Sequence, residues 1–460
     1  MKLLDTIAAV STPRGKGGVA VIRISGDSAA EIGDAVFSAV CKRPVSELPS
    51  GKLCYGEIKM PAGETVDDGL AVIFRAPHSF TGEDTVEINC HGGVLVTEKV
   101  LSAVLAAGAR AAEAGEFTRR AYVNGKMRLS EAESLGDLLE AKSDSQLRLA
   151  RSGVRGMLAD KIDRIYDSLR GTLTSVYAAI DFPDEDLSEM SREEICESVE
   201  KSLAETKKLA ATYSTGRAIN EGVRTVICGR TNAGKSSVYN RILGYDAAIV
   251  TDIEGTTRDV LKESATLGKT LLRLCDTAGL RETEDKVESI GIERTRSEIE
   301  RAELILAVFD RSRPLTEEDI ALAEEVTKGS TAAIGLFNKS DAEITENMER
   351  IESLFKYKLN ISAKDGKGFE ELAELIDSLF IDGTIEIGSD AVVTGARQYA
   401  SLLTAAESLD SALEDLRADV PLDLCCVAIE GALTSLGELD GRELGEEIVS
   451  EIFAHFCVGK

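Results

Sequence analysis

The sequence has no run of 18 or more apolar residues, and its first residues lack an apolar core followed by a small-residue cleavage site. We therefore expect no membrane span and no export, and we predict a cytoplasmic protein. Zinc-ligand spacings are also missing, although the chain has nine cysteines. Thiols at such irregular spacing are typical of a reducing compartment. The adjacent Cys425 and Cys426 are interpreted as small semi-buried hydrophobes rather than metal ligands.

Positive charge is scarce. The 53 Lys and Arg residues are outnumbered by 80 Asp and Glu residues, which gives a formal net charge of -27. Proteins hold nucleic acid chiefly through Lys and Arg that neutralise phosphates, so most of this surface repels a polyanion. If RNA is a partner, a second protein is expected to supply much of the basic surface. Taken by itself, the charge indicates only solubility.

The order of the patterns predicts a multidomain α+β and α/β protein, with roughly three domains for 460 residues. Strand-like runs dominate the first 120 residues and are followed by a helix from Val94 to Ala107. Short β-branched runs that alternate with helices from Val223 to Phe380 predict a doubly wound parallel sheet. The predicted bounds are 1–122 for the N-terminal α+β domain, 123–215 and 385–460 for the two halves of a helical domain, and 216–384 for the inserted nucleotide-binding domain.

Two capping boxes mark helix starts in the helical domain. Ser130 with Glu133 and Ser191 with Glu194 have the required spacing. An apolar stripe is expected on the first of these helices, and Pro183 predicts a break between helices. The stripe consists of Leu129, Ala132, Leu135 and Leu139.

The segment Gly229 to Ser236, GRTNAGKS, fits the phosphate-binding loop of nucleotide-binding proteins. A strand, TVIC, precedes it and a helix, SSVYNRIL, follows it, which is the structural context that the loop requires. Backbone N–H groups and the helix N-terminus are expected to hold the phosphates, with Lys235 on the β and γ oxygens and Ser236 on Mg²⁺. The alternative is an ordinary glycine-rich turn.

The motifs DTAG, NKSD and SAK follow this loop in order and predict that the nucleotide is guanine. A carboxylate at Asp341 accepts two hydrogen bonds from the N1 and N2 groups of guanine, which adenine does not offer. Asp276 is expected to reach Mg²⁺ through water, and the Gly279 amide to contact the γ-phosphate. The predicted GTP-binding residues are Asn232, Ala233, Gly234, Lys235, Ser236, Ser237, Thr251, Asp252, Ile253, Glu254, Gly255, Thr256, Thr257, Asp276, Thr277, Ala278, Gly279, Asn338, Lys339, Asp341, Ser362, Ala363 and Lys364.

The residue after DTAG is Leu280, where Ras-like proteins carry the glutamine that orients water, and the motifs contain no arginine finger. Such a finger contributes about 10³ to 10⁵ in rate, so another group must supply the charge. Asn232 offers a carbonyl oxygen that can bind a monovalent cation beside the phosphates. A local turn contact is the alternative role for Asn232.

Over its whole length the sequence resembles the MnmE (TrmE) family of tRNA-modification GTPases. The motifs that carry the resemblance are the N-terminal GKGGVAVIRISG, SFTGEDTVEINCHGG, GEFTRRAYVNGK, GTTRD, DTAGLRE and the C-terminal CVGK. The sequence departs from the family pattern at two positions. Thr231 replaces a proline in the phosphate-binding loop, which is expected to weaken potassium affinity, and Val458 replaces an isoleucine of similar volume.

The resemblance implies a potassium-activated GTPase whose G domains pair face to face during hydrolysis. It places K⁺ on Asn232, Thr251, Ile253 and Thr256, and Mg²⁺ on Ser236 and Thr257. It also makes Glu288 the residue that positions water, and Lys235 and Cys457 catalytic. Without the resemblance, the segment around Glu288 indicates a solvated acidic face, and Cys457 a buried thiol. His91 and His455 are interpreted as structural.

The resemblance further implies a homodimer held by the N-terminal domains, which bind 5-formyltetrahydrofolate or a related folate. Arg23, Glu87, Lys126 and Lys460 match the folate contacts, although the pattern alone indicates an edge-strand charge at Arg23 and a polar strand face at Glu87. The family acts on tRNA with an FAD-dependent partner of the MnmG (GidA) type, as a heterotetramer. Together they add an aminomethyl or carboxymethylaminomethyl group to carbon-5 of the wobble uridine.

Two other functions fit parts of the sequence. A regulatory GTPase of the Era and EngA type shares the GTT switch and DTAG, but needs a basic RNA-binding module, whereas the helical tail here is acidic. A stand-alone folate-dependent one-carbon transferase, with the G domain as a timer, is the third alternative.

Overall fold

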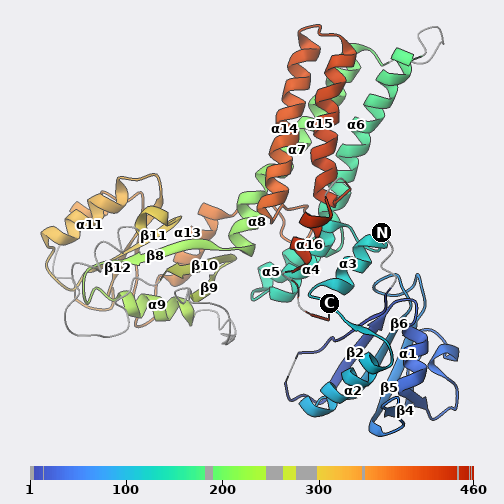
Figure 1. Cartoon of the computed structure of the whole chain (residues 1–460). Helices are drawn as coiled ribbons and strands as arrows, with labels where there is room; N and C mark the ends of the chain where they lie inside the picture. The colour runs from blue at the N-terminus through green and yellow to red at the C-terminus, as the bar shows by residue number, and fades with distance from the viewer. Residues whose placement is uncertain are drawn as a thin grey trace. The chain divides into compact units, whose positions relative to one another are not determined.

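The structure is a computed structural model of the chain. It describes residues 5–13, 15–181, 190–244, 263–275, 298–343, 348–442, 445–454, 456 and 458–459 (Figure 1). The chain divides into two compact units, one of Met1–Gly136 with Thr434–Lys460 and one of Asp137–Leu433. The division falls within helices α4 (Leu129–Glu140) and α15 (Leu422–Asp440).

The first unit contains a seven-stranded sheet in its described part. Neighbouring strands are antiparallel except β1 and β7, which are parallel. β2 lies inside the sheet, so the pattern-based interpretation of Arg23 as an edge-strand charge was wrong. In spatial order the strands are β3 (Phe37–Ala39), β4 (Cys54–Lys59), β5 (Thr65–Phe74), β6 (Thr85–His91), β2 (Val19–Ser25), β1 (Ile7–Val10) and β7 (Arg110–Ala111).

Helices cover both faces of this sheet. Alternate residues of β2, including Ile22 and Ile24, pack in one core with α1 (Ala29–Val36) and α2 (Val94–Ala106). On the opposite face Phe117, from α3 (Glu116–Val123), packs on Ile7 and Ala9. The C-terminal helix α16 (Glu446–Ala454) belongs to the same unit, and its Phe453 is buried with Leu129 of α4.

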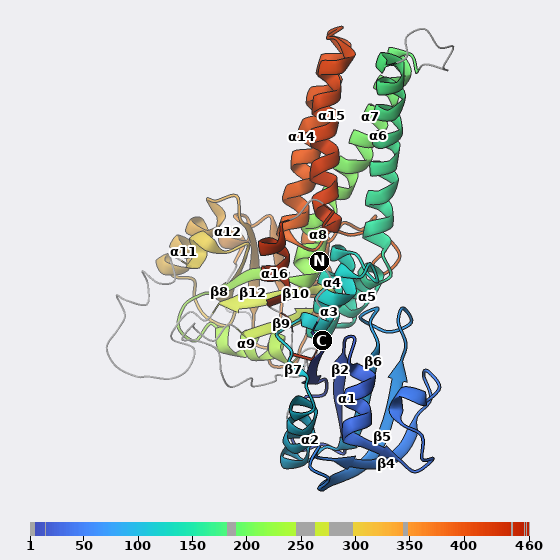
Figure 2. The same cartoon turned by 45° about the vertical axis from the view of Figure 1, so that its right-hand side comes forward.

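The helical part of the second unit is built from long antiparallel helices. Figures 1 and 2 both show α6 (Met157–Asp181), α7 (Arg192–Ala211), α14 (Ala396–Arg417) and α15 side by side. The contacts include packing of α14 and of α6 on α7. The shorter α8 (Tyr213–Asn220) leads from α7 into the second sheet, and α5 (Asp144–Val154) packs against α6 and α8. No helix in the described residues is long and apolar enough to cross a membrane.

The second sheet has six strands in the described residues, and their residues alternate between two cores. In β11, Leu306 and Val308 face one core with α9 (Lys235–Leu243) and α13 (Phe369–Phe380). Ile305 and Ala307 face the other, with α11 (Glu317–Thr327) and α12 (Glu349–Glu352). This two-sided burial is the doubly wound fold that the sequence predicts. In spatial order the strands are β13 (Tyr357–Asn360), β12 (Ala332–Asn338), β11 (Leu304–Asp310), β8 (Val223–Cys228), β10 (Thr270–Cys275) and β9 (Glu263–Leu267).

One detail of this sheet differs from the prediction. The pairs from β13 to β10 are parallel, but β9 runs antiparallel to β10, and the hairpin between them turns at Gly268. A two-residue turn joins antiparallel strands, whereas a parallel crossover requires about a dozen residues or more. The sheet is therefore mixed at this edge.

The helix-start predictions had mixed outcomes. Ser191 and Glu194 form the predicted capping box of α7. The prediction at Ser130 was wrong, because α4 begins at Leu129 and the Ser130 hydroxyl donates to Asp440 Oδ1 at 2.8 Å. The apolar stripe on this helix is also incomplete, since Leu129 and Ala132 are buried but Leu139 is 42% exposed. Pro183 lies outside the described residues.

Candidate functional site

The GRTNAGKS segment forms the loop between β8 and α9, at the carboxyl end of a parallel strand. Gly229 and Gly234 adopt positive φ of 151° and 99°, which L side chains rarely reach. A Cβ atom on Gly229 would lie 2.4 Å from the Val308 carbonyl oxygen, and one on Gly234 would lie 2.1 Å from Asn338 Nδ2. Both glycines are therefore required for the loop to pack against the neighbouring strands.

Lys235 is the first residue of α9 and folds back over the loop. Its Nζ donates hydrogen bonds of 2.8 Å to the Gly229 carbonyl oxygen and 2.9 Å to that of Arg230. Burial lowers the pKa of the Lys235 ammonium. Ser236 and Ser237 follow and are exposed at the start of the helix. The loop thus presents a cation, two hydroxyls and a helix N-terminus at one place, which suits a phosphate chain.

Asn338 joins the phosphate loop to the predicted base-binding loop. Its Nδ2 donates to the Ala233 carbonyl oxygen at 3.1 Å, and its Oδ1 accepts from the Ala363 N–H at 3.1 Å. The side chain is 2% exposed, so both bonds are shielded from water. The NKSD and SAK segments, which the sequence predicted to act together, are therefore adjacent.

Asp341 and Ser362 form the rim of the base-binding loop. The Ser362 hydroxyl donates to Asp341 Oδ1 at 2.8 Å, and this hydrogen bond lowers the pKa of the exposed Asp341 carboxyl. Asp341 is therefore ionised at neutral pH and keeps a second oxygen to accept from a base. Lys364 is exposed beside it, and Lys339 has a positive φ of 65°.

Asp310 and Arg313 belong to this site, although sequence reasoning missed them. Asp310 accepts from Lys339 Nζ at 2.6 Å and pairs with Arg313 Nε at 2.9 Å. Burial acts to raise the pKa of Asp310, but hydrogen bonds from Lys339 and Ser312 outweigh it and lower that pKa. Arg313 also donates to the backbone carbonyl oxygen of Asn232 at 3.3 Å. The sequence could have indicated Asp310, because it ends a predicted strand and doubly wound folds bind ligands at the carboxyl ends of their strands.

Several predicted site residues lie outside the described residues. Their positions and contacts are therefore not part of the geometry above. They are Thr251, Asp252, Ile253, Glu254, Gly255, Thr256, Thr257, Asp276, Thr277, Ala278, Gly279, Leu280, Glu288, Cys457 and Lys460, together with His455.

The predicted folate residues Arg23 and Glu87 face each other across neighbouring strands. The register pairs them directly, and Arg23 Nη2 lies 2.8 Å from Glu87 Oε1. The Arg23 guanidinium carbon lies 5.5 Å from the ring centre of Phe80 and 5.7 Å from that of Phe117. Both charged side chains keep some exposure, 19% for Arg23 and 21% for Glu87. Lys126 donates to the Pro77 carbonyl oxygen at 2.9 Å.

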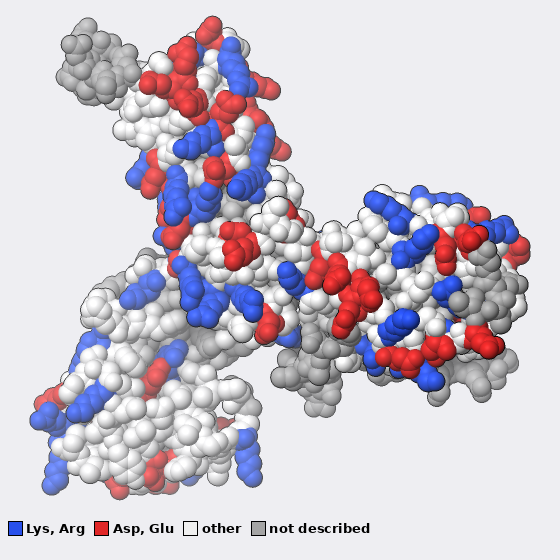
Figure 3. Space-filling view, turned by 180° about the vertical axis from the view of Figure 1, so that it is seen from behind, with Lys and Arg blue, Asp and Glu red and all other residues white. Residues whose placement is uncertain are grey.

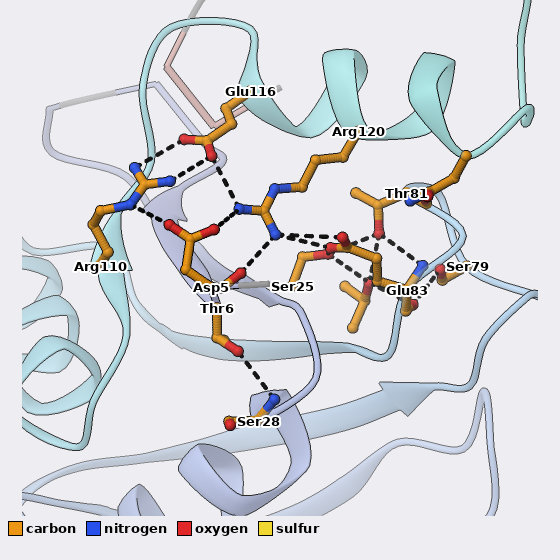
Figure 4. Close-up of polar contacts among 12 residues, drawn as sticks. Asp5, Thr6, Ser25, Ser28, Ser79, Thr81, Glu83, Arg110, Glu116 and Arg120 are labelled. Carbon is orange, nitrogen blue, oxygen red and sulfur yellow. Dashed lines mark hydrogen bonds and ion pairs between the residues drawn. The ribbon is translucent and has the colours of Figure 1, made fainter. Parts of the chain in front are cut away.

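A buried ion network supports this region (Figure 4). Arg120 of α3 is 1% exposed and contacts Asp5 at 2.8 Å, Glu116 at 3.0 Å and Glu83 at 3.2 Å. Glu83 also accepts from the Ser25 hydroxyl at 2.8 Å. Arg120 thus links the segment before β1 to the loop that carries Phe80 and Glu83, and through Glu83 to Ser25 at the end of β2, the strand that carries Arg23.

His91 is the last residue of β6 in the same sheet. The His91 Nδ1 atom lies 2.8 Å from Asp67 Oδ1. The backbone N–H of His91 donates to Asp67 Oδ2. The Asp67 hydrogen bond raises the pKa of the exposed imidazole. This cross-strand contact agrees with a structural role.

Comparison with known proteins identifies relatives over the whole chain. A family model described as the MnmE helical domain matches residues 129–457, and one described as the GTP-binding protein TrmE N-terminus matches residues 6–126. The tRNA modification GTPase MnmE of Geobacillus kaustophilus is 41% identical over 464 residues, which is 100% of both chains. That of Bacillus pumilus is 40% identical over 461 residues, covering 99% of this chain and 100% of the relative.

The likeness to solved structures is much lower. A crystal structure of Aquifex aeolicus Era matches 40% of this chain and 66% of its own at 21% identity, with a TM-score of 0.27. Such a score supports no conclusion about this chain.

Proposed function

The chain belongs to the MnmE family of tRNA modification GTPases, and from this premise we propose that GTP hydrolysis in its G domain drives modification of the tRNA wobble uridine. The product is a uridine with an aminomethyl or carboxymethylaminomethyl group on carbon-5. The family relation supports the tRNA part of the proposal. The observation that carries the GTP site is the double hydrogen bond of Asn338 to Ala233 and Ala363, which joins the two loops proposed for the phosphates and the base. We place the reaction in the cytoplasm, with its tRNA substrate.

The described residues support binding of GTP with Mg²⁺. Lys235 and the N-terminus of α9 would hold the phosphates, and Asp341 would accept from the guanine N1 and N2 groups. The exposed Ser236 hydroxyl is an oxygen ligand of the kind that Mg²⁺ prefers, and Thr257 would be the second protein ligand. The ion would neutralise charge that develops on the phosphates.

Hydrolysis would depend on a potassium ion, because the chain lacks the Ras-type glutamine. Asn232 is exposed in the phosphate loop with a positive φ of 64°, and Arg313 fixes its backbone carbonyl. Its side-chain oxygen therefore fits the role of a cation ligand beside the phosphates. Thr251, Ile253 and Thr256 would complete the site when two G domains pair, and Glu288 would orient the attacking water. The ion would supply the positive charge that an arginine finger supplies elsewhere.

The N-terminal residues fit a folate. Because Arg23 and Glu87 are paired at 2.8 Å, both would face the same part of the ligand, and the pterin ring offers polar groups for both. Phe80 and Phe117 supply aromatic rings beside them. Lys126 and Lys460 would be the cations that hold the glutamyl carboxylate. The bound folate would donate the one-carbon unit, and Cys457 would act near it.

A flavoprotein partner of the MnmG (GidA) type is part of the proposal, in a heterotetramer built on a homodimer of this chain. The net charge of -27 supports this division of work. On the face drawn in Figure 3, Lys and Arg are interspersed with Asp and Glu among the described residues. A partner that supplies basic surface would compensate for this charge pattern. We therefore expect weak tRNA binding by this chain alone.

Reconstitution with purified components tests the proposal. The complete mixture contains this chain, the flavoprotein, tRNA, the folate, GTP and K⁺, and the nucleosides are analysed by mass spectrometry. We expect modified uridine only in the complete mixture, with loss when either protein or GTP is omitted. Product without the flavoprotein would instead support a stand-alone folate-dependent transferase. Tight, salt-sensitive tRNA binding by this chain alone would contradict the division of work.

A further inference from the structure

Two thiols meet at the edge of the N-terminal sheet. Cys41 lies in the turn after β3, the edge strand, and Cys54 is the first residue of β4. The Val40 N–H donates to the Tyr55 carbonyl oxygen at 2.9 Å and continues the pairing of the two strands. This pairing brings the Sγ atoms of Cys41 and Cys54 to 3.4 Å. A disulfide requires about 2.04 Å, so the two sulfur atoms would have to approach by about 1.4 Å to join.

The pair is accessible, which separates it from most of the other described cysteines. Cys41 is exposed and Cys54 is partly exposed. Cys196, on α7, is also partly exposed and provides a comparison within the same chain. The buried cysteines among the described residues are Cys90, Cys228, Cys275, Cys425 and Cys426.

The surroundings of the two thiols differ in a way that assigns their roles. A backbone hydrogen bond at Arg43, a hydrogen bond from Cys54 and the charge of Arg43 lower the pKa of Cys41. Burial and the contact with Cys41 raise the pKa of Cys54. The thiolate is the reactive form of cysteine, so Cys41 is suited to attack an oxidant and Cys54 to resolve the product.

We propose that Cys41 and Cys54 form a reversible oxidation site that reacts with hydroperoxides, with Cys41 as the attacking thiol and Cys54 as the resolving thiol. The Cys41 thiolate attacks one oxygen of hydrogen peroxide, the O–O bond breaks, and the departing hydroxide takes up a proton to become water. Cys41 is then a sulfenic acid. The Cys54 sulfur attacks the Cys41 sulfur, the S–O bond breaks, and the hydroxide leaves as water with the proton from Cys54. Two electrons pass from the thiols to the peroxide. A thiol reductant then returns two electrons to the disulfide, restores both thiols and is itself oxidised to a disulfide.

The disulfide would fix the turn after β3 against β4. This turn contains a left-handed residue, Lys42, with φ of 57°, and closes with a hydrogen bond from the Lys42 N–H to the Ala39 carbonyl oxygen. Cross-linking would therefore reduce opening of the sheet edge. Neither thiol belongs to the nucleotide site, so this proposal stands independently of the proposed function.

Peptide mapping of the full-length protein tests the pair directly. The reduced protein is treated with limiting hydrogen peroxide, remaining thiols are alkylated, and the protein is digested with trypsin. Cleavage after Lys42 and Lys52 separates the two cysteines, so a disulfide joins the peptides 24–42 and 53–59. We expect this linked pair to form before any oxidation of Cys196, to lack two hydrogen atoms relative to the separate peptides, and to disappear with dithiothreitol.

Single variants test the two roles. In Cys54→Ser we expect a sulfenic acid on Cys41, trapped by a 1,3-dicarbonyl probe such as dimedone. In Cys41→Ser we expect Cys54 to be oxidised no faster than Cys196, and Cys196→Ser is the matched control that leaves the linked peptides unchanged. The proposal is overturned if peroxide yields no 24–42 to 53–59 link, if Cys196 oxidises first, or if Cys54 alone traps the probe. The readout is independent of GTP hydrolysis and of tRNA modification.

Discussion

The carboxamide of Asn338 donates a hydrogen bond of 3.1 Å to the backbone carbonyl oxygen of Ala233, and so ties the end of β12 to the phosphate loop. The Oδ1 atom of the same side chain accepts a hydrogen bond of 3.1 Å from the Ala363 N–H. One buried side chain thereby sets the spacing between the loop for the phosphates and the loop for the base. If the two loops bind the two ends of one nucleotide, as we propose, both ends must fit that spacing, and the contact would couple phosphate binding to base recognition.

Replacing Asn338 with alanine is expected to weaken GTP binding. The change leaves the Ala233 carbonyl and the Ala363 N–H without their buried partner, at a cost of about 1–3 kcal/mol, or roughly 5- to 150-fold in Kd. Titration with a fluorescent GTP analogue measures the Kd of the variant and of the wild type. Ser340→Ala is the matched control, because the Ser340 hydroxyl is buried without a hydrogen-bond partner among the described residues. An unchanged Kd in Asn338→Ala would refute the coupling.

Asp341→Asn is expected to change the base preference. Guanine offers N–H groups at N1 and N2, whereas xanthine has a carbonyl oxygen at carbon-2 that an asparagine amide can meet. We expect GTP affinity to fall by about 10- to 100-fold and the preference for XTP over GTP to rise. Competition between the two nucleotides measures the ratio. Asp365→Asn serves as control, since Asp365 also contacts Ser362, at 3.4 Å. A ratio that does not move would remove Asp341 from base recognition.

Asn232→Ala is expected to abolish stimulation of GTP hydrolysis by potassium. The wild-type rate should be higher in KCl than in NaCl, and the variant should have the same low rate in both, because the charge facing the transition state is lost. Asn240→Ala, an exposed asparagine on α9, is the matched control. Equal wild-type rates in the two salts, or full stimulation in Asn232→Ala, would show that potassium acts elsewhere or not at all.

Arg120→Met is expected to lower the free energy of unfolding of the N-terminal unit. The difference from the wild type should become smaller in acid. Removing a buried arginine leaves Asp5, Glu83 and Glu116 without their shared cation, at a cost of about 3–5 kcal/mol. Hydrogen bonds from Arg110 lower the pKa of Asp5, and those from Arg110 and Arg120 lower the pKa of Glu116 against the opposing effect of burial. These carboxylates therefore stabilise the fold above their unfolded pKa of about 4, and this contribution is lost as the pH falls through the lower folded values.

Hydrogen exchange of the β1 and α3 amides in the full chain, at pH 7 and in acid, measures this effect. Arg110→Met is the comparison, because Arg110 is 43% exposed and its ion pairs are screened by solvent. We expect a clearly smaller loss of protection in Arg110→Met. If Arg120→Met loses the same amount of protection at pH 7 and in acid, lost packing rather than lost charge causes the instability.

The sequence predicted much of the nucleotide domain because its signals are local. The strand at β8 and the loop from Gly229 follow from β-branched runs and from glycines that the backbone requires. Asp310 and Arg313 were missed although Asp310 ends a predicted strand, because their contacts with Lys339 and the phosphate loop depend on how β11 lies beside β8 and β12. The antiparallel β9 was missed for a related reason, since its direction is set by the turn at Gly268.

In the rest of the chain, tertiary contacts overrode the local signals. Ser191 caps α7 as predicted, and its hydroxyl accepts from the Glu194 N–H. The Ser130 hydroxyl instead donates to Asp440, more than 300 residues away. The pairing of Arg23 with Glu87 likewise depends on the register of β2 and β6. Sequence reasoning identified both residues, but not that they neutralise each other.

The most direct test of the central claim is mass spectrometry of wobble uridines in tRNA from a strain that lacks this gene, complemented with the wild-type chain or with Lys235→Ala at equal protein levels. In our proposal Lys235 holds the phosphates, so its loss should stop GTP hydrolysis while the N-terminal unit stays intact. We predict that the carbon-5 modification is absent from the deletion strain, returns with the wild-type chain and does not return with Lys235→Ala. Modified uridine in the deletion strain, or full restoration by Lys235→Ala, would contradict the claim that GTP hydrolysis by this protein drives the modification.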